Sequence, residues 1–210
     1  TPTTVATAVP APKYSEAPML AELVKAGKLP PVEQRLPEKP IVVDTPEIGQ
    51  YGGIWHRGFL GPSDFNGIAR VIDDALVTFA PDGGSVVMKY AESVTPSSDF
   101  KTWTVKLPKG AKWSSGDPFT TDDIMFWYVD ALQNKDLTPS LPGWMTNKDG
   151  SLVEVKKVDD VTVQWNYKDP HTTFLFELAN AEYGDKNIPC FLPSKFLKQF
   201  HASYAKKEDL

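Results

Sequence analysis

Cysteine, histidine and long apolar runs are scarce in this sequence, and each scarcity excludes a class of structure. The 210 residues hold one cysteine, Cys190, so no disulfide can form within the chain and no cysteine cluster can bind a metal. Its neighbours Pro189 and Phe191 indicate a small buried apolar side chain. The three histidines lie far apart without metal-ligand spacing, so we expect no metal site. No apolar run approaches the ~18 residues that would span a membrane.

An excess of basic residues is also missing. The 22 Lys and Arg are outnumbered by 27 Asp and Glu, which gives a net charge of −5 and argues against a nucleic-acid partner. There is no Gly-rich phosphate loop, nucleophile elbow or Cys/His pair, so we expect no catalytic residues and no cofactor. Three pairs of aspartates are present. We interpret Asp122-Asp123 as a helix N-terminus and Asp159-Asp160 as a turn, and favour capping for Asp73-Asp74.

Proline and aromatic residues are abundant and unevenly placed. Nine of the 19 prolines fall within the first 46 residues. Residues 1–14 are rich in Thr, Ala and Pro and predict a flexible tether. Residues 15–50 predict a helix that Ser15 caps and Gly27 ends, followed by a proline-rich extended segment packed on the folded body. The body itself begins near Tyr51.

Hydrophobic periodicity in the body predicts a mixture of strands and helices. We expect strands at 54–60, 86–90 and 102–107, and a hairpin of 152–158 with 161–167. We expect helices at 65–77, from Thr120, at 172–181 and from Pro193. Two loop aromatics, Phe65 and Trp144, have small or polar neighbours that suit a ligand cleft, and for both of them core packing is an equal alternative.

One stretch of the body resembles a known family. Ala91-Glu92-Ser93, the strand 103–107, and above all the run KGAKWSSGDPFTTDD at 109–123 are similar to the family 5 extracellular solute-binding proteins of bacterial ABC importers. The segments 74–77, 81–83 and 191–201 resemble further elements of that family, so the likeness spans about 51–205.

The resemblance implies an α/β fold, the first lobe of a periplasmic-binding-protein-like (class II) architecture with its extra subdomain, built of a mixed sheet plus helices. Residues 51–210 would be part of lobe one, with the inserted subdomain at about 77–150. Family members are exported, and many are lipid-anchored. They are more than twice this length, so we expect the remaining C-terminal polypeptide and the permease subunits as partners.

The resemblance also implies where ligand binds. In the family the loop after the first strand commonly touches the solute, which here maps to Gly61, Pro62, Ser63, Asp64, Phe65 and Asn66. Asp64 would pair with a ligand ammonium, as a peptide amino terminus offers, and capping of the next helix is an equal alternative. We expect Trp113 to be a buried anchor of the 109–119 loop that does not touch ligand.

The function implied is that of an importer's solute receptor outside the cytoplasm, with a peptide as the first candidate ligand. A ligand-sensing or scaffold domain on the same fold is the alternative. A hydrolase would need a nucleophile and base that the sequence does not offer.

Overall fold

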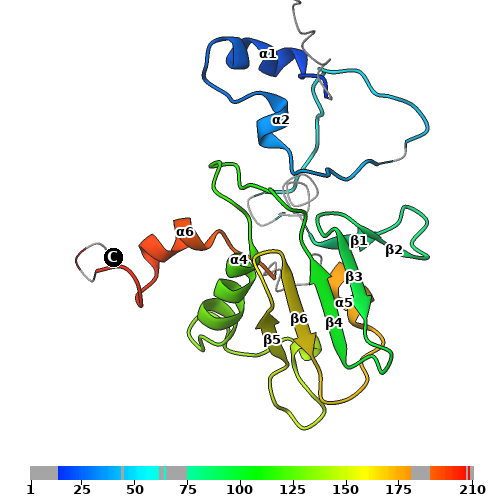
Figure 1. Ribbon diagram of the computed structural model, residues 1–210, viewed down its shortest axis with the longest axis vertical. Helices are drawn as coiled ribbons and strands as arrows, with labels where there is room; N and C mark the ends of the chain where they lie inside the picture. Colours follow the sequence, from blue (N-terminus) through cyan, green and yellow to red (C-terminus); the bar gives the residue numbers. More distant parts are fainter. Residues whose placement is uncertain are drawn as a thin grey trace, which may run out of the picture.

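The computed structural model describes residues 14–43, 45–61, 64, 75–180, 190–206 and 208. A four-stranded sheet with its helices forms the lower part of Figure 1, and the N-terminal segment with α1 (Pro18–Lys25) and α2 (Val32–Arg35) lies at the upper end. No helix within these residues has the length and apolarity needed to cross a bilayer.

The main sheet has the order β3-β4-β6-β5. Its strands are β3 (Ser93–Pro96), β4 (Thr102–Lys106), β6 (Thr162–Asn166) and β5 (Glu154–Lys157). Among the described residues its strands all pair antiparallel, so the expectation of a mixed sheet is wrong; short connections join β3 to β4 and β5 to β6, and a short connection reverses the strand direction. Trp103 pairs with Trp165 and Val105 with Val163, and all four side chains are buried because alternate residues point to one face of a strand. The predicted strand at 102–107 and the predicted hairpin are therefore confirmed.

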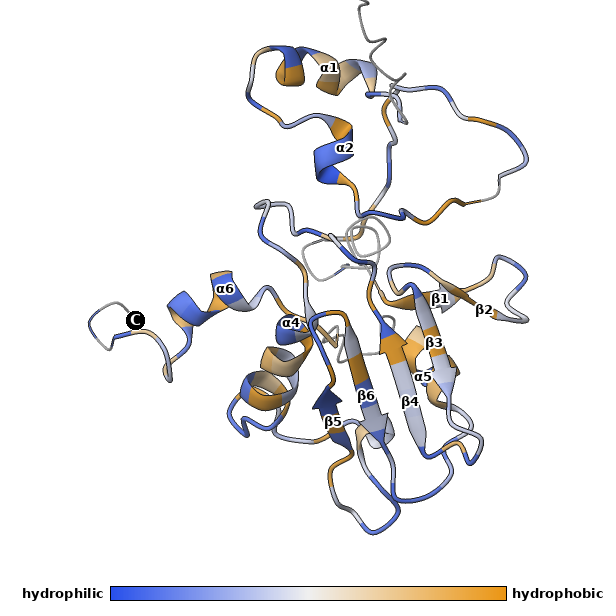
Figure 2. Cartoon of the chain, viewed as in Figure 1, coloured by the Kyte–Doolittle hydropathy of each residue, from blue (hydrophilic) through white to orange (hydrophobic). Residues whose placement is uncertain are grey.

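The hairpin that joins β5 to β6 turns at Asp159-Asp160, as predicted. The Asp159 carboxylate accepts a hydrogen bond from the amide of Val161 at 2.8 Å, which is the local bond that favours aspartate in turns. In Figure 2 the edge strand β5 is hydrophilic along most of its length, although Val155 points into the core. An edge strand with charged side chains is protected against pairing with other chains.

A second, smaller sheet pairs β1 (Val77–Phe79) with β2 (Val86–Met88), and the predicted turn at 81–84 joins them. Helix α5 (Phe174–Asn180) packs against β1 and confirms the helix expected at 172–181. Phe174 is fully buried and contacts the rings of Trp103 and Trp165, at centroid distances of 5.1 and 5.6 Å. The core thus lies between the main sheet and its helices.

The helix predicted from Thr120 is α4 (Thr121–Phe126), which continues as the π-helical turn η1 (Trp127–Leu132). It begins with a capping box. The Thr120 side chain accepts from the amide of Asp122, and the Asp123 side chain accepts from the amide of Thr120. The interpretation of Asp122-Asp123 as a helix N-terminus is therefore correct.

The N-terminal segment differs in two details from the prediction. Helix α1 starts at Pro18 with Ala17 as its N-cap and makes no side-chain capping bond, so Ser15 is not the cap. The short helix α2 interrupts the segment expected to be extended. Pro31 is its N-cap, where the missing amide removes no helical hydrogen bond and the proline carbonyl accepts from the amide of Gln34. Gly27 ends α1 as predicted, with a φ of +66° that glycine adopts readily.

The strand predicted at 54–60 is wrong. Neither sheet of the described residues includes this segment, and Ile54 and Leu60 are 82% and 99% exposed. A segment rich in apolar and aromatic residues forms a strand only when a neighbour supplies backbone partners and covers the apolar side chains. Residues 1–13 of the predicted tether, Asp73-Asp74 and residues 65–74 of the helix expected at 65–77 lie outside the described residues. The described end of that helix is wrong, because Ala75 and Leu76 are not helical and Val77 begins strand β1, where it pairs with Met88.

Candidate functional site

The loop after residue 60 is the first candidate site, and Gly61 and Asp64 are its described residues. The amide of Asp64 donates to the carbonyl of Gly61 at 2.9 Å, and the Asp64 carboxylate accepts from the amide of Leu60 at 3.0 Å. Gly61 has a φ of +135°, which a residue with a side chain rarely adopts. Pro62, Ser63, Phe65 and Asn66 lie outside the described residues.

Trp144, the second candidate, is placed by the short helix η2 (Gly143–Met145). Its ring stacks on Trp127 at a centroid distance of 6.0 Å with the planes 7° apart, and it approaches Phe174 at 6.2 Å. The carbonyl of Trp144 accepts a hydrogen bond from the hydroxyl of Tyr167 at 2.8 Å. The half-buried indole therefore packs on the core, while Asp64 is bonded to its own loop.

The Lys109–Phe119 segment, which we call the Trp113 loop, is a tight turn closed by its own backbone. The amide of Trp113 donates to Asp117 and that of Gly116 donates to Trp113, both at 2.9 Å. Gly116 has a φ of +87°, a left-handed conformation that favours glycine. Trp113 packs edge-on against Phe119 at 5.2 Å. These contacts agree with the prediction that Trp113 anchors the loop, but the side chain is half-buried and not buried as predicted, because one side of it lines an open pocket.

Asp123 joins this loop to a distant part of the chain. One carboxylate oxygen, Oδ2, accepts from the amide of Thr120 at 3.1 Å and from the indole Nε1 of Trp113 at 3.0 Å. The other, Oδ1, accepts from the amide and the hydroxyl of Ser194, at 2.9 and 2.7 Å. The residue is only 3% exposed, so four donors replace the water that the carboxylate loses on burial.

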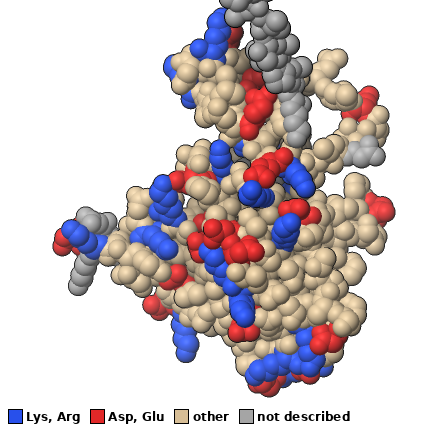
Figure 3. All heavy atoms as spheres, viewed as in Figure 1, with Lys and Arg blue, Asp and Glu red and all other residues tan. Residues whose placement is uncertain are grey.

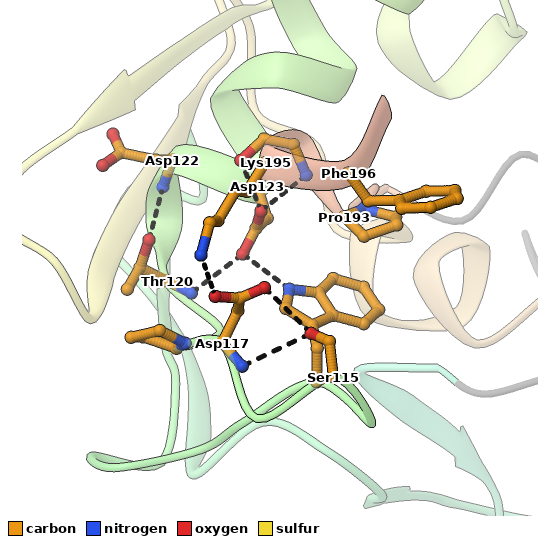
Figure 4. Close-up of a pocket in the computed structure, with 11 residues that line it drawn as sticks. Ser115, Asp117, Thr120, Asp122, Asp123, Pro193, Lys195 and Phe196 are labelled. Carbon is orange, nitrogen blue, oxygen red and sulfur yellow. Dashed lines mark hydrogen bonds and ion pairs between the residues drawn. The ribbon is translucent and has the colours of Figure 1, made fainter. Parts of the chain in front are cut away.

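A pocket of about 220 Å³ opens where these segments meet (Figure 4). The Trp113 loop and the start of α4 form one side, and α6 (Ser194–Leu197) with the preceding proline forms the other. Its lining combines rings with carboxylates and an ammonium: Trp113, Ser115, Asp117, Pro118, Thr120, Asp122, Asp123, Pro193, Ser194, Lys195 and Phe196.

Electrostatics at this pocket are dominated by an ion pair between Asp117 and Lys195, whose residues are 78 positions apart. Hydrogen bonds from the Lys195 ammonium, first, and from the Ser115 hydroxyl hold the pKa of Asp117 below its usual value. This arrangement was not predicted from the sequence. The run at 109–123 singles out the loop, but no local pattern indicates that residues 193–196 lie across from it.

Other reactive side chains of the described residues have structural roles. Cys190 is buried, as predicted, and burial raises the pKa of its thiol to about 12, which leaves the thiol protonated and unreactive. Burial, with a smaller effect of Glu177, raises the pKa of Tyr167. No group of described His, Cys, Asp and Glu residues could hold a metal ion. On the face shown in Figure 3, charges of both signs are interspersed.

Comparison with known proteins connects this architecture to one family. The model of "Bacterial extracellular solute-binding proteins, family 5 Middle" matches residues 85–209, which is more than half of the chain. The match begins before β2 and continues past α6, so it includes the Trp113 loop, Asp123 and the pocket.

Individual relatives agree with the family match. A solved oligopeptide-binding protein OppA is 41% identical and superposes over 94% of this chain and 30% of its own, with a TM-score of 0.83. The periplasmic binding protein MelB from Agrobacterium fabrum C58, solved in complex with stachyose, is 32% identical over 95% of this chain and 32% of its own, with a TM-score of 0.70. The periplasmic alpha-galactoside-binding protein of Rhizobium meliloti (strain 1021) is 32% identical over 92% of this chain.

The superpositions confirm the predicted fold class, that of periplasmic binding proteins with mixed helices and sheets. This chain spans about 30% of the length of the relatives it matches.

Proposed function

Because the chain belongs to the family 5 bacterial extracellular solute-binding proteins, we propose that it is part of the substrate-binding component of an ABC importer. The protein would capture a peptide or another small solute between two lobes and present it to the permease. The family match over residues 85–209 is the observation that carries this proposal. The family and the relatives are binding proteins, and the family is extracellular.

The relatives suggest the solute class. They include proteins named for oligopeptides, for di- and tripeptides and for alpha-galactosides, and one is solved with stachyose. We propose a peptide as the first ligand to test, because the OppA structure combines 41% identity with a TM-score of 0.83 over 94% of this chain. An oligosaccharide is the second, since an alpha-galactoside-binding relative matches over 92% of the chain.

For the contact residues we propose the loop Gly61, Pro62, Ser63, Asp64, Phe65 and Asn66, together with Trp144. The loop has two properties that suit a binding role. Its backbone at Gly61 has a left-handed φ, and the carboxylate of Asp64 lies on a surface loop rather than in an ion pair of the core. A carboxylate placed in this way would favour a ligand that carries an ammonium group.

The mechanism follows from a two-lobed receptor. A solute that contacts both lobes favours the closed state by the contacts it makes only there, and the permease distinguishes closed from open receptors. We place the protein outside the cytoplasm, held by a lipid anchor in its full-length form.

Calorimetric titration of the full-length protein with di-, tri- and oligopeptides and with alpha-galactosides tests the proposal, after mass spectrometry of any co-purified solute. We expect Asp64→Ala and Phe65→Ala to weaken binding about tenfold, the value of one lost charge-assisted or aromatic contact, with little change in melting temperature. Asp82→Ala is the matched control, because Asp82 occupies another exposed turn. Trp144→Ala tests whether its loop faces the cleft.

Unchanged affinity in Asp64→Ala, Phe65→Ala and Trp144→Ala would remove the contact assignment and leave the receptor function standing. A full-length protein that binds no small solute would remove the function itself.

A further inference from the structure

The pocket between the Trp113 loop and α6 already holds a positively charged group. The Lys195 ammonium reaches across the opening to the Asp117 carboxylate (Figure 4). The lysine side chain is 77% exposed, so little packing fixes it in place, whereas the Asp117 side chain is 29% exposed and has a second bond from Ser115 at 3.0 Å. The carboxylate is therefore the fixed partner and the ammonium the replaceable one.

The carboxylates that line the pocket differ in their hydrogen-bond and ion-pair partners. Asp123 accepts four hydrogen bonds from within the protein. Asp122 is bonded to Lys157 at 2.8 Å, which lies outside the pocket lining. Asp117 is thus the one of the three lining aspartates whose cationic partner comes from the pocket itself.

The walls around Asp117 suit an apolar stem. The rings of Trp113, Pro118, Pro193 and Phe196 surround the opening, and Phe196 is 57% exposed. An aromatic wall beside a carboxylate attracts organic cations twice, through the ring quadrupole and through a charge-assisted hydrogen bond. A volume of about 220 Å³ accommodates a group with a few carbons.

We propose that this pocket binds a small organic cation, a primary amine or guanidine on a short apolar stem, and that Lys195 occupies the cation position when no ligand is present. None of the lining residues belongs to the loop at 61–66, so the site is separate from the one proposed for the imported solute. The ligand cation would displace the Lys195 ammonium from Asp117 and place its stem against Trp113 and Phe196.

Two substitutions at the same ion pair should have opposite effects. Lys195→Met keeps an unbranched apolar side chain and removes the competing ammonium, so we expect the dissociation constant of n-butylguanidinium to fall about tenfold. Asp117→Asn keeps the shape and removes the negative charge, so we expect affinity to fall by about tenfold or more. Both factors correspond to one charge-assisted hydrogen bond. If the ion pair had a purely structural role, the two substitutions would not change the affinity for n-butylguanidinium in opposite directions.

The experiment is a titration of the full-length protein with n-butylguanidinium, and with n-butylurea as the uncharged probe of the same shape. The indole Nε1 proton of Trp113 reports binding by NMR, since it donates to Asp123 beside the pocket, and Trp113→Phe assigns its signal. Thermal melts confirm that each variant folds. We expect saturable shifts with the guanidinium and none with the urea.

Equal binding of the two probes would overturn the proposal, because the cation would then contribute nothing. So would a Lys195→Met variant that binds the guanidinium no more tightly than the wild type, or an Asp117→Asn variant that binds it equally well. These probes do not depend on the imported solute, so the result is separate from the test of the importer function.

Discussion

Removal of the Asp123 carboxylate is the most informative perturbation of this fold. The buried side chain accepts two hydrogen bonds within its own loop and helix and two from Ser194, 71 residues away. Asp123→Ala would leave these donors without an acceptor in a site that is almost closed to water. Hydrogen bonds to charged groups contribute roughly 1.5–3 kcal/mol each, but they are not additive, and the loss of one partner of a buried charged network costs about 3–5 kcal/mol.

That cost is large beside a total stability of about 5–15 kcal/mol. For a domain of this size it lowers the melting temperature by roughly 6–20 °C. Differential scanning calorimetry and urea unfolding of the full-length protein measure the change. Asp122→Ala is the matched control, because Asp122 is the adjacent residue, lies in the first turn of the same helix and is 64% exposed at its side chain. Exposed ion pairs contribute less than about 1 kcal/mol.

A smaller substitution makes the test independent of complete unfolding. Ser194→Ala removes one of the four donors and should cost about 1 kcal/mol alone and much less in an Asp123→Ala background. If Asp123→Ala destabilises the protein no more than Asp122→Ala, or if the two Ser194→Ala effects are equal, Asp123 does not join these segments.

Three further predictions concern Trp113, Asp149 and the isolated chain. Trp113→Ala should lower stability by about 3–5 kcal/mol, the usual cost of truncating a packed aromatic, and leave selectivity for the imported solute unchanged, which melts and titrations check. Hydrogen bonds from Lys168, first, and from Ser151 hold the pKa of Asp149 below its usual 3.8. The stability that this pair contributes is therefore present above pH ~4 and is lost as the pH falls through the lowered pKa. In acid titrations the difference in unfolding free energy between wild type and Asp149→Asn should shrink below pH ~4. The isolated 210-residue chain should self-associate and bind solute weakly, since Ile54 and Leu60 are exposed, and a monodisperse chain with micromolar affinity by light scattering and titration would contradict this.

The sequence predicts those elements whose partners are close in the chain. The prediction of a helix from Thr120 is correct because the capping box that starts the helix lies within four consecutive residues. The β5–β6 hairpin is predicted correctly because a short turn over residues 159–161 joins the two strands and fixes their register. Trp103 and Trp165 pair across β4 and β6 although they are 62 positions apart, and the alternation in each strand indicates the buried face without indicating the partner.

The candidate site was harder to predict. The sequence draws attention to the 109–123 run, but the pocket also needs Lys195 and Phe196 from a segment more than 70 residues later. The two segments are held together by the hydrogen bonds between Ser194 and Asp123, and the sequence of neither segment predicts this contact. For Trp144 the sequence did suggest a candidate contact residue. Its polar neighbours suggested a cleft as much as the core, and the structure stacks its indole on Trp127.

The segment 54–60 shows why a segment rich in apolar and aromatic residues can still predict the wrong local structure. Its apolar residues include Trp55, Phe59 and Leu60, each more than 65% exposed. Burial of such side chains is worth about 1.5–3 kcal/mol each, so a surface that covered several of them would add a large fraction of a domain's stability. The pattern describes a strand that pairs and packs, and the described residues supply neither a backbone partner nor a cover. An apolar, aromatic segment therefore forms a strand only together with the surface that covers it and the strand that pairs with it.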